Sequence, residues 1–172
     1  FSYSRTGDRE AYVIRQMRGR QLDLQLIIPV LRDNIAEVLV NDKRVKWKAV
    51  TNAVGRPLIE INVNAGEKYD VVITWKGKAV NSIVGYRHAP YNFEGFFTTA
   101  IWASGFKLYD PQKVLKKVAI ADNSLSGSFN QDEGHHTFFI RTTQGAFTWW
   151  QPVDLFIVKQ YPIIESKSKD KP

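Results

Sequence analysis

Hydrophobic and polar residues alternate with a period of two along most of the chain, most clearly over residues 38–77. Ile59, Ile61 and Val63 share one face of a short segment, and the residues between them are polar. The next segment repeats the alternation at Tyr69, Val71, Ile73 and Trp75. A period of two places successive side chains on opposite faces of a strand, so the pattern predicts half-buried antiparallel strands.

The first hairpin of this region can be predicted from its turn residues. Val40 leads into Asn41 and Asp42, and Val45 resumes the apolar pattern. Asn and Asp tolerate the left-handed backbone conformation of a tight turn, so we expect a short hairpin turn here. Further strands are predicted for residues 10–17, 20–29, 96–108, 116–121, 124–129, 136–143, 147–150 and 153–159. Residues 1–9 are polar, and we expect either a lead-in that frays or the end of an interdomain linker.

The alternating region occurs twice in the chain. Shifting the sequence along itself by about eighty residues brings apolar positions and turn glycines of the two halves into register. The aligned pairs include Val38 with Val118, Val40 with Ile120, Gly55 with Gly134, Ile59 with Phe138, and Asp33 with Asp110. We interpret the match as a structural duplication. The alternative is that any two antiparallel meanders share such apolar spacing.

These patterns predict an all-β fold of two tandem antiparallel sandwich-like units of the immunoglobulin-like kind. We expect the first unit over residues 1–80 and an aromatic-rich connection over residues 81–95. The second unit is expected over residues 96–160, followed by a disordered Ser/Lys/Asp tail over residues 161–172. A single larger sandwich, built from two similar halves, is the alternative architecture.

Composition is that of a globular chain with a large aromatic core. Of 172 residues, 44% are hydrophobic and 13% are aromatic. Cysteine is absent, which excludes disulfides and thiolate metal sites. No apolar run is long enough for a transmembrane helix, so we expect no membrane span. The chain starts at Phe1 without a signal-peptide pattern, as in a processed precursor or a piece of a longer chain.

The net charge of +7 raises the possibility of nucleic-acid binding. The cations are dispersed in four groups, at residues 15–20, 43–48, 113–117 and 167–171. No recognition helix or aromatic RNA-binding signature accompanies them, and lysines on edge strands also prevent edge-to-edge association. We therefore do not expect nucleic acid as a partner.

The sequence offers few candidates for catalysis or metal binding. His135 and His136 are adjacent in a predicted strand, so their side chains point to opposite faces and are poorly placed to share one metal ion. There is no Gly-x-Ser-x-Gly motif and no glycine-rich phosphate loop. Acidic residues such as Asp132 and Asp154 are explained by turns and exposed surface. We expect no catalytic residue, no metal and no cofactor.

The aromatic residues give the one candidate binding site. Trp149 and Trp150 are neighbours in a predicted strand, so one ring can enter the core while the other faces solvent. A solvent-facing indole is a platform for the apolar face of a sugar ring. Gln151 would supply an amide to the sugar hydroxyls, and His135 and His136 lie in the same meander. The alternative is that both rings are internal and pack the sandwich.

Three segments carry a resemblance to a known family. They read VNDKRVKWKAV (40–50), GRPLIEINVNAGEKYDVVITWKG (55–77) and GHHTFFIRTTQGAFTWWQPVDLFIV (134–158). Together they resemble the accessory C-terminal β-sandwich regions of large secreted Bacteroidetes proteins related to glycoside hydrolases. The chain departs from that pattern at Asp42-Lys43, where Gly is usual. The resemblance implies a glycan-degrading context, a periplasmic or extracellular location, and catalysis in another part of a larger parent chain.

Two functions follow as expectations. The first is a non-catalytic accessory module of a secreted glycan-processing protein, structural or weakly carbohydrate-binding, with polysaccharide as its ligand. The second is a basic domain that binds a polyanion, either nucleic acid or an acidic polysaccharide, and it rests on the net charge of +7. Salt dependence separates them, because binding through anionic groups weakens with ionic strength and stacking on an indole does not.

Overall fold

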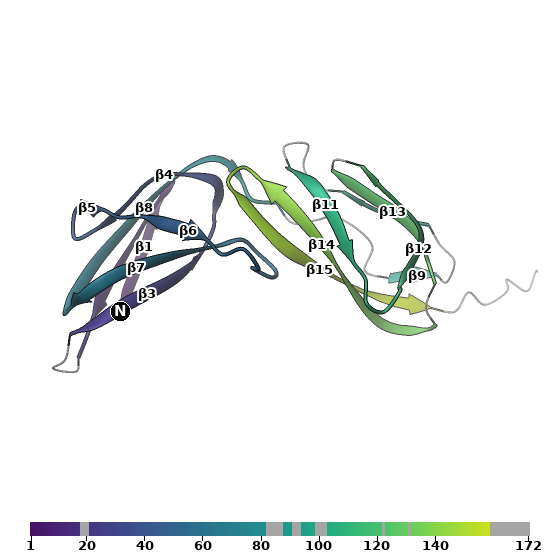
Figure 1. Ribbon diagram of the computed structural model, residues 1–172, viewed down its shortest axis with the longest axis horizontal. Coiled ribbons are helices and arrows are strands. Elements are labelled where there is room, and N and C mark those ends of the chain that lie inside the picture. Colours follow the sequence, from purple (N-terminus) through teal and green to yellow (C-terminus); the bar gives the residue numbers. More distant parts are fainter. Residues whose placement is uncertain are drawn as a thin grey trace, which may run out of the picture.

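The computed structural model describes residues 1–17, 21–81, 88–90, 94–98, 103–121, 123–130 and 132–158. Every regular element in these ranges is a β-strand, which confirms the predicted all-β class. The strands form two sandwiches that follow each other end to end along the long axis of the molecule (Figure 1). The buried apolar residues form two clusters, one centred on each sandwich.

The first sandwich pairs a sheet of order β1-β2-β8-β4-β5 with a sheet of order β3-β7-β6. Its strands are β1 (Ser2–Thr6), β2 (Arg9–Arg15), β3 (Leu22–Pro29), β4 (Arg32–Val40), β5 (Lys43–Arg44), β6 (Trp47–Ala49), β7 (Leu58–Gly66) and β8 (Lys68–Ala79). All of their pairings are antiparallel. The first unit therefore occupies the segment in which the alternation is clearest.

The second sandwich pairs a sheet of order β11-β14-β15-β9 with a sheet of order β10-β13-β12. Its strands are β9 (His88–Pro90), β10 (Glu94–Thr98), β11 (Ala103–Tyr109), β12 (Leu115–Ala121), β13 (Ser124–Phe129), β14 (Gly134–Gln144) and β15 (Phe147–Val158). β9 runs parallel to β15, and it lies inside the predicted connection 81–95. The predicted tail 161–172 lies outside the described residues.

The alternating segments fold as their pattern predicts. Ile59 and Ile61 are fully buried on β7. The four alternating residues of β8 are also buried, namely Tyr69, Val71, Ile73 and Trp75. At the first hairpin, Asn41 and Asp42 have φ values of 49° and 60°, which confirms the expected left-handed turn.

The N-terminal residues differ from the prediction, because they form strand β1 instead of a fraying lead-in. β1 pairs with β2 along its whole length. The Tyr3 hydroxyl donates a hydrogen bond of 2.6 Å to Glu10 Oε1, and the rings of Tyr3 and Tyr12 lie 5.1 Å apart. All five residues of β1 are exposed, so the strand shows no apolar alternation by which the sequence would have revealed it.

β15 also differs from the prediction, because it runs unbroken through Pro152 where two strands were expected. The backbone of Trp150 points away from β14: its N–H donates 2.8 Å to Ala53 O. Pro152, two residues on, faces the same way, and β9 pairs with β15 only from Phe156 onward. The missing N–H of Pro152 therefore lies on a side where no described strand needs it.

The two sandwiches share part of their topology. β3-β7-β6 corresponds to β10-β13-β12, and β4 beside β8 corresponds to β11 beside β14. The second sandwich follows the B-E-D and C-F-G order of immunoglobulin domains. In the first, β2 lies beside β8, in the place that β15 takes beside β14.

The shared topology changes the residue correspondence between the halves. The sequence alignment placed Ile59 of β7 against Phe138 of β14, and Val40 of β4 against Ile120 of β12. By strand order β7 corresponds to β13 and β4 to β11, so the predicted pairs are wrong by one strand. The physical reason is that a period of two is the same in every half-buried strand and does not identify which strand it is.

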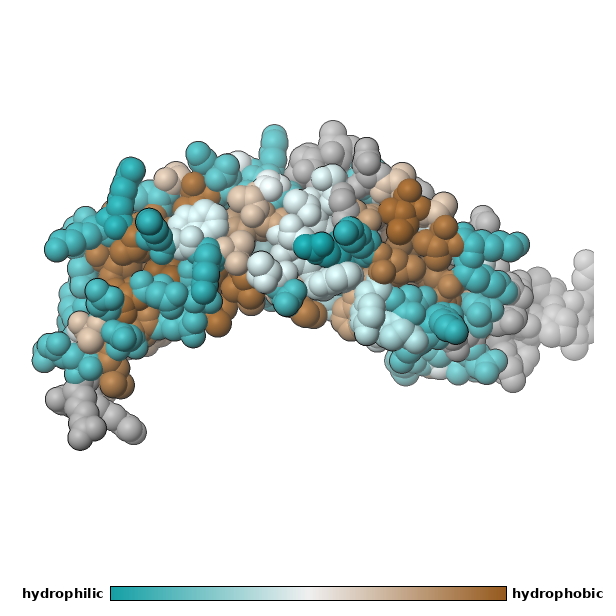
Figure 2. Space-filling view, in the orientation of Figure 1, coloured by the Kyte–Doolittle hydropathy of each residue, from teal (hydrophilic) through white to brown (hydrophobic). Residues whose placement is uncertain are grey.

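The tip of the β14–β15 hairpin belongs to the core of the first sandwich. Phe147 and Trp149, each 1% exposed, lie in the same buried cluster as Ile59 and Trp75. The Phe147 ring lies 5.7 Å from that of Trp47. The space-filling view shows side chains filling the region between the sandwiches (Figure 2). The first core is therefore completed by residues that come from the second unit.

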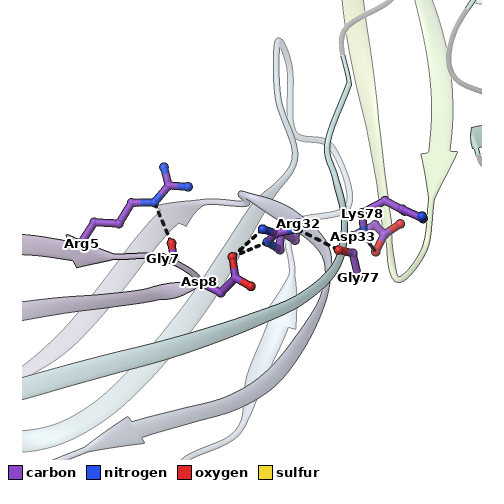
Figure 3. Close-up of polar contacts among 7 residues, drawn as sticks. All are labelled: Arg5, Gly7, Asp8, Arg32, Asp33, Gly77 and Lys78. Atoms are coloured by element: carbon purple, nitrogen blue, oxygen red, sulfur yellow. Dashed lines mark hydrogen bonds and ion pairs between the residues drawn. The ribbon is translucent and has the colours of Figure 1, made fainter.

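Asp33, near the start of β4, joins the two units at this junction. Its backbone oxygen accepts a hydrogen bond of 3.0 Å from Ala146 N, and its Oδ1 accepts one of 2.9 Å from Lys78 N (Figure 3). A Cβ on Gly145 would lie 2.1 Å from Asp33 O, and one on Gly77 would lie 2.0 Å from Oδ1. Both glycines have positive φ values, so larger residues are excluded by conformation and by space.

A first prediction tests the shared core. Trp149→Ala should lower the free energy of unfolding by about 3–5 kcal/mol, because it leaves a cavity in the first core. Urea unfolding followed by circular dichroism measures the effect. Thr148→Ser is the matched control, since this side chain is only partly buried on the outer side of the same strand and Ser keeps the hydroxyl that bonds Thr143. A parental midpoint for Trp149→Ala would show that the first core closes without the hairpin.

A second prediction concerns Trp75, which is 2% exposed and donates 2.9 Å from Nε1 to Glu10 Oε2. Trp75→Ala should cost about 3–5 kcal/mol through the cavity alone. Trp75→Phe keeps most of the volume but removes a donor from buried Glu10, so it should fall between Trp75→Ala and the parent. Thermal midpoints measured for the three proteins check this order. A Phe variant as stable as the parent would show that the bond to Glu10 contributes nothing.

Candidate functional site

The β14–β15 hairpin sends alternate side chains to two different places. Phe147 and Trp149 point into the first core, and Gln151 follows on the same face of β15. Trp150 points to the opposite face, which is the outer face of the sheet β11-β14-β15-β9. The adjacent tryptophans are therefore separated by the strand itself, with one ring internal and one half-buried at the surface.

The outer face carries a cluster of aromatic rings around Trp150. Tyr109 of β11 is 56% exposed, and its ring lies 6.2 Å from the Trp150 ring in an edge-to-face arrangement. The Phe139 ring lies 6.1 Å from that of Tyr109. We call Tyr109, Phe139 and Trp150 the aromatic face. Figure 2 shows pale side chains of intermediate hydropathy gathered over β11, β14 and β15.

Polar groups border the aromatic face. Arg141 is opposite Trp150 on the neighbouring strand, and Lys107 of β11 is opposite Arg141. Thr143 and Thr148 hydrogen-bond through their hydroxyls at 2.9 Å. The surface thus combines apolar rings with charged donors and hydroxyls, which is the combination that a sugar ring with its hydroxyls requires.

The two histidines do not reach this face. His135 is exposed and its ring lies 4.8 Å from that of Phe156, while His136 Nε2 lies 2.8 Å from Asp132 O. His135 pairs with Phe156, six residues along β14 from Arg141. Six residues of a strand span about 20 Å, so the structure does not bring the histidines together with Trp150.

Gln151 and Trp149 line a pocket between the sandwiches. It has a volume of about 190 Å³, and Arg56 and Asn81 also line it. Trp149 is 1% exposed, so it contributes an edge and offers no ring face to a ligand. Of the five residues that the sequence singled out, only Trp150 presents an aromatic surface to solvent beside polar partners.

Sequence reasoning missed Tyr109 and Phe139. Phe139 is in the predicted strand 136–143 and Tyr109 directly follows the predicted strand 96–108, but nothing in the sequence shows that β11 pairs with β14. Tyr109 and Phe139 become neighbours only through that pairing, in which they lie directly opposite each other. The available signal was the spacing Lys107-x-Tyr109, which places a cation and an aromatic ring on one face.

A polar cluster also lies on the outer side of the first sandwich. Glu60 Oε1 lies 2.8 Å from Lys48 Nζ and accepts 2.8 Å from Asn62 Nδ2. Hydrogen bonds from Lys48, then Asn62 and Gln25, lower the pKa of Glu60 from 4.5 to about 2. These groups satisfy one another, and they adjoin an open hollow of about 500 Å³ beside Trp47.

Among the residues that the structure describes, no group of three or more His, Asp or Glu side chains is placed to hold a metal ion. Within the same ranges, no helix has the length and apolar character of a membrane span. The aromatic face is therefore the strongest candidate for a site.

A third prediction uses the low pKa of Glu60. The ionised carboxylate is favoured in the folded state, so its contribution to stability is present above pH 4.5 and is lost as pH falls toward about 2. Lys48→Gln removes the largest cause of the shift. The urea midpoint of wild type should exceed that of Lys48→Gln above pH 4.5, and the gap should shrink below it. Lys46→Gln, also exposed, is the control; a gap that is independent of pH would contradict the assignment.

Comparisons with known proteins assign no family to this chain. No protein-family model matches the chain, and no curated protein matches its sequence. The aromatic face itself offers rings at the surface of a sheet, bordered by hydroxyl groups and cations.

Proposed function

We propose that this chain is a non-catalytic accessory module of a secreted glycan-processing protein, and that it binds polysaccharide through the aromatic face. The observation that carries the proposal is the Tyr109–Trp150 pair, with ring centroids 6.2 Å apart. The two residues belong to β11 and β15, the strands on either side of β14. Two rings at the surface of a sheet form a platform for the C–H face of a sugar. The strands hold the platform rigidly, which lowers the entropy cost of binding.

The burial of Trp149 supports this reading of Trp150. Trp149 is fixed in the first core, and the backbone of Trp150 exchanges hydrogen bonds of 2.8 Å with Ala53 and Gly55. Trp150 is therefore anchored by its backbone on one side and by its neighbour on the other. Its ring is held at the surface for a ligand and does not need to reorganise on binding.

The proposal places catalysis in another part of a larger parent chain, outside the cytoplasm. It is supported by the resemblance to accessory regions of secreted glycoside-hydrolase-related proteins. The acidic residues near the aromatic face also accept hydrogen bonds from other groups of the protein. Asp110 accepts from Val114 N and Leu115 N at 2.9 and 2.8 Å, and Asp154 accepts 2.6 Å from Thr137. These carboxylates stabilise turns and strand pairs.

The alternative, a basic domain that binds a polyanion (nucleic acid or an acidic polysaccharide) through its overall charge, has less support. Cations of the first sandwich are paired with carboxylates: Arg44 with Glu37 at 2.6 Å, Lys48 with Glu60 at 2.8 Å, and Lys68 with Asp70 at 2.7 Å. Paired cations contribute little to the attraction of a polyanion. Two of the four cations in the group at residues 43–48 therefore have a carboxylate beside them.

A fourth prediction tests the platform. Trp150→Ala and Tyr109→Ala should each weaken polysaccharide binding by about tenfold or more, since stacking on one ring contributes on the order of 1–3 kcal/mol. Tyr109→Phe keeps the ring and should bind like the parent. Calorimetry against a panel of plant and animal polysaccharides measures this, and acrylamide quenching reports the exposure of Trp150. A parent protein that binds nothing on the panel would leave the module a structural role only.

A further inference from the structure

Two cations lie directly opposite each other on the aromatic face. Lys107 of β11 pairs with Arg141 of β14. Like charges at opposed positions destabilise a sheet. In the part of the chain that the structure describes, neither side chain forms an ion pair or a side-chain hydrogen bond. The fold thus carries an unfavourable pair that no neighbouring anion compensates.

The pair is aligned with the indole of the platform. Arg141 is opposite Lys107 on one side and opposite Trp150 on the other, so the three residues form one row across β11, β14 and β15. Neighbouring strands are about 4.8 Å apart, and the row spans about 10 Å. That length suits a sugar ring on Trp150 whose charged substituent, or that of the next sugar, reaches Arg141 and Lys107.

We infer that the aromatic face recognises an acidic glycan, with an anionic sugar substituent held by Arg141 and Lys107 beside a ring stacked on Trp150. The inference rests on the proposed function and names its substrate class. A guanidinium binds a carboxylate or a sulfate through two parallel hydrogen bonds, and a nearby ammonium adds a second charge. An anion between the two cations converts their repulsion into attraction.

The same face favours a glycan over a nucleic acid. The row offers two cations, fewer than the several phosphate contacts on which nucleic-acid affinity depends. Thr143 and Thr148 supply hydroxyl groups beside the rings.

The test uses pairs of polysaccharides that differ only in charge. Polygalacturonate is compared with its methyl ester, and a sulfated galactan with its unsulfated backbone, by calorimetry with the whole chain. The charged member of at least one pair should bind about tenfold tighter, which corresponds to 1.4 kcal/mol. Added salt should weaken binding of the charged member and leave the neutral member unchanged. Which pair shows the preference distinguishes a carboxylate from a sulfate.

Variants separate this inference from the proposed function. Arg141→Gln and Lys107→Gln should lose the preference for the charged member, and their thermal midpoints should equal or exceed that of the parent because a repulsive pair is removed. Lys76→Gln removes an exposed charge on β8 of the first sandwich and should keep the preference. Trp150→Ala should weaken binding of both members.

Each other outcome overturns a stated part. Equal binding of charged and neutral members overturns the acidic-glycan inference and leaves the proposed function standing. Loss of the preference in Lys76→Gln as well would show a general charge effect and overturn the role of Arg141 and Lys107. No binding of any polysaccharide overturns both proposals. Tighter binding of a single-stranded oligonucleotide than of either charged polysaccharide assigns the row to nucleic acid.

Discussion

The structure depends on the insertion of the β14–β15 tip into the first sandwich. Phe147 and Trp149 are as deeply buried there as Ile59 on β7. They come from β15, the last strand of the chain, far in sequence from the strands of the first unit. Burial of two aromatic side chains contributes on the order of 3–6 kcal/mol, a large share of the stability of a small sandwich. Close packing extends to the glycines beside the tip, because a Cβ on Gly77 or Gly145 would clash with Asp33.

This insertion also determines which residues form the proposed binding surface. Alternation along β15 means that the burial of Trp149 sends Trp150 to the other side, next to the ring of Tyr109. The position of the platform therefore follows from the junction. Trp149, which packs in the first core, and Trp150, which we propose to contact the ligand, are adjacent on β15. The cations in the row of Trp150 belong to β11 and β14, so the second sandwich supplies the groups that we propose to select among ligands.

The buried positions of β7 and β8 could be predicted from the sequence, because alternation directly reports which side of a strand is buried. Ile61 and Val71 illustrate this. Strand partners could not be predicted, since the spacing of β7 resembles that of β13 and β14 equally. The candidate site was found only in part for the same reason. Trp150 stood out by composition, whereas Tyr109 and Lys107 join it through a pairing between segments far apart in the chain.

The shared core has a consequence for how such a module is inherited. A sandwich with a closed core can be exchanged between proteins by recombination at its boundaries. Here a break within residues 81–95 would separate the first unit from Phe147 and Trp149 and leave its interior open to water. The dependence runs one way, because among the described residues the core of the second sandwich contains none from the first, so only the first sandwich would lose part of its interior on separation.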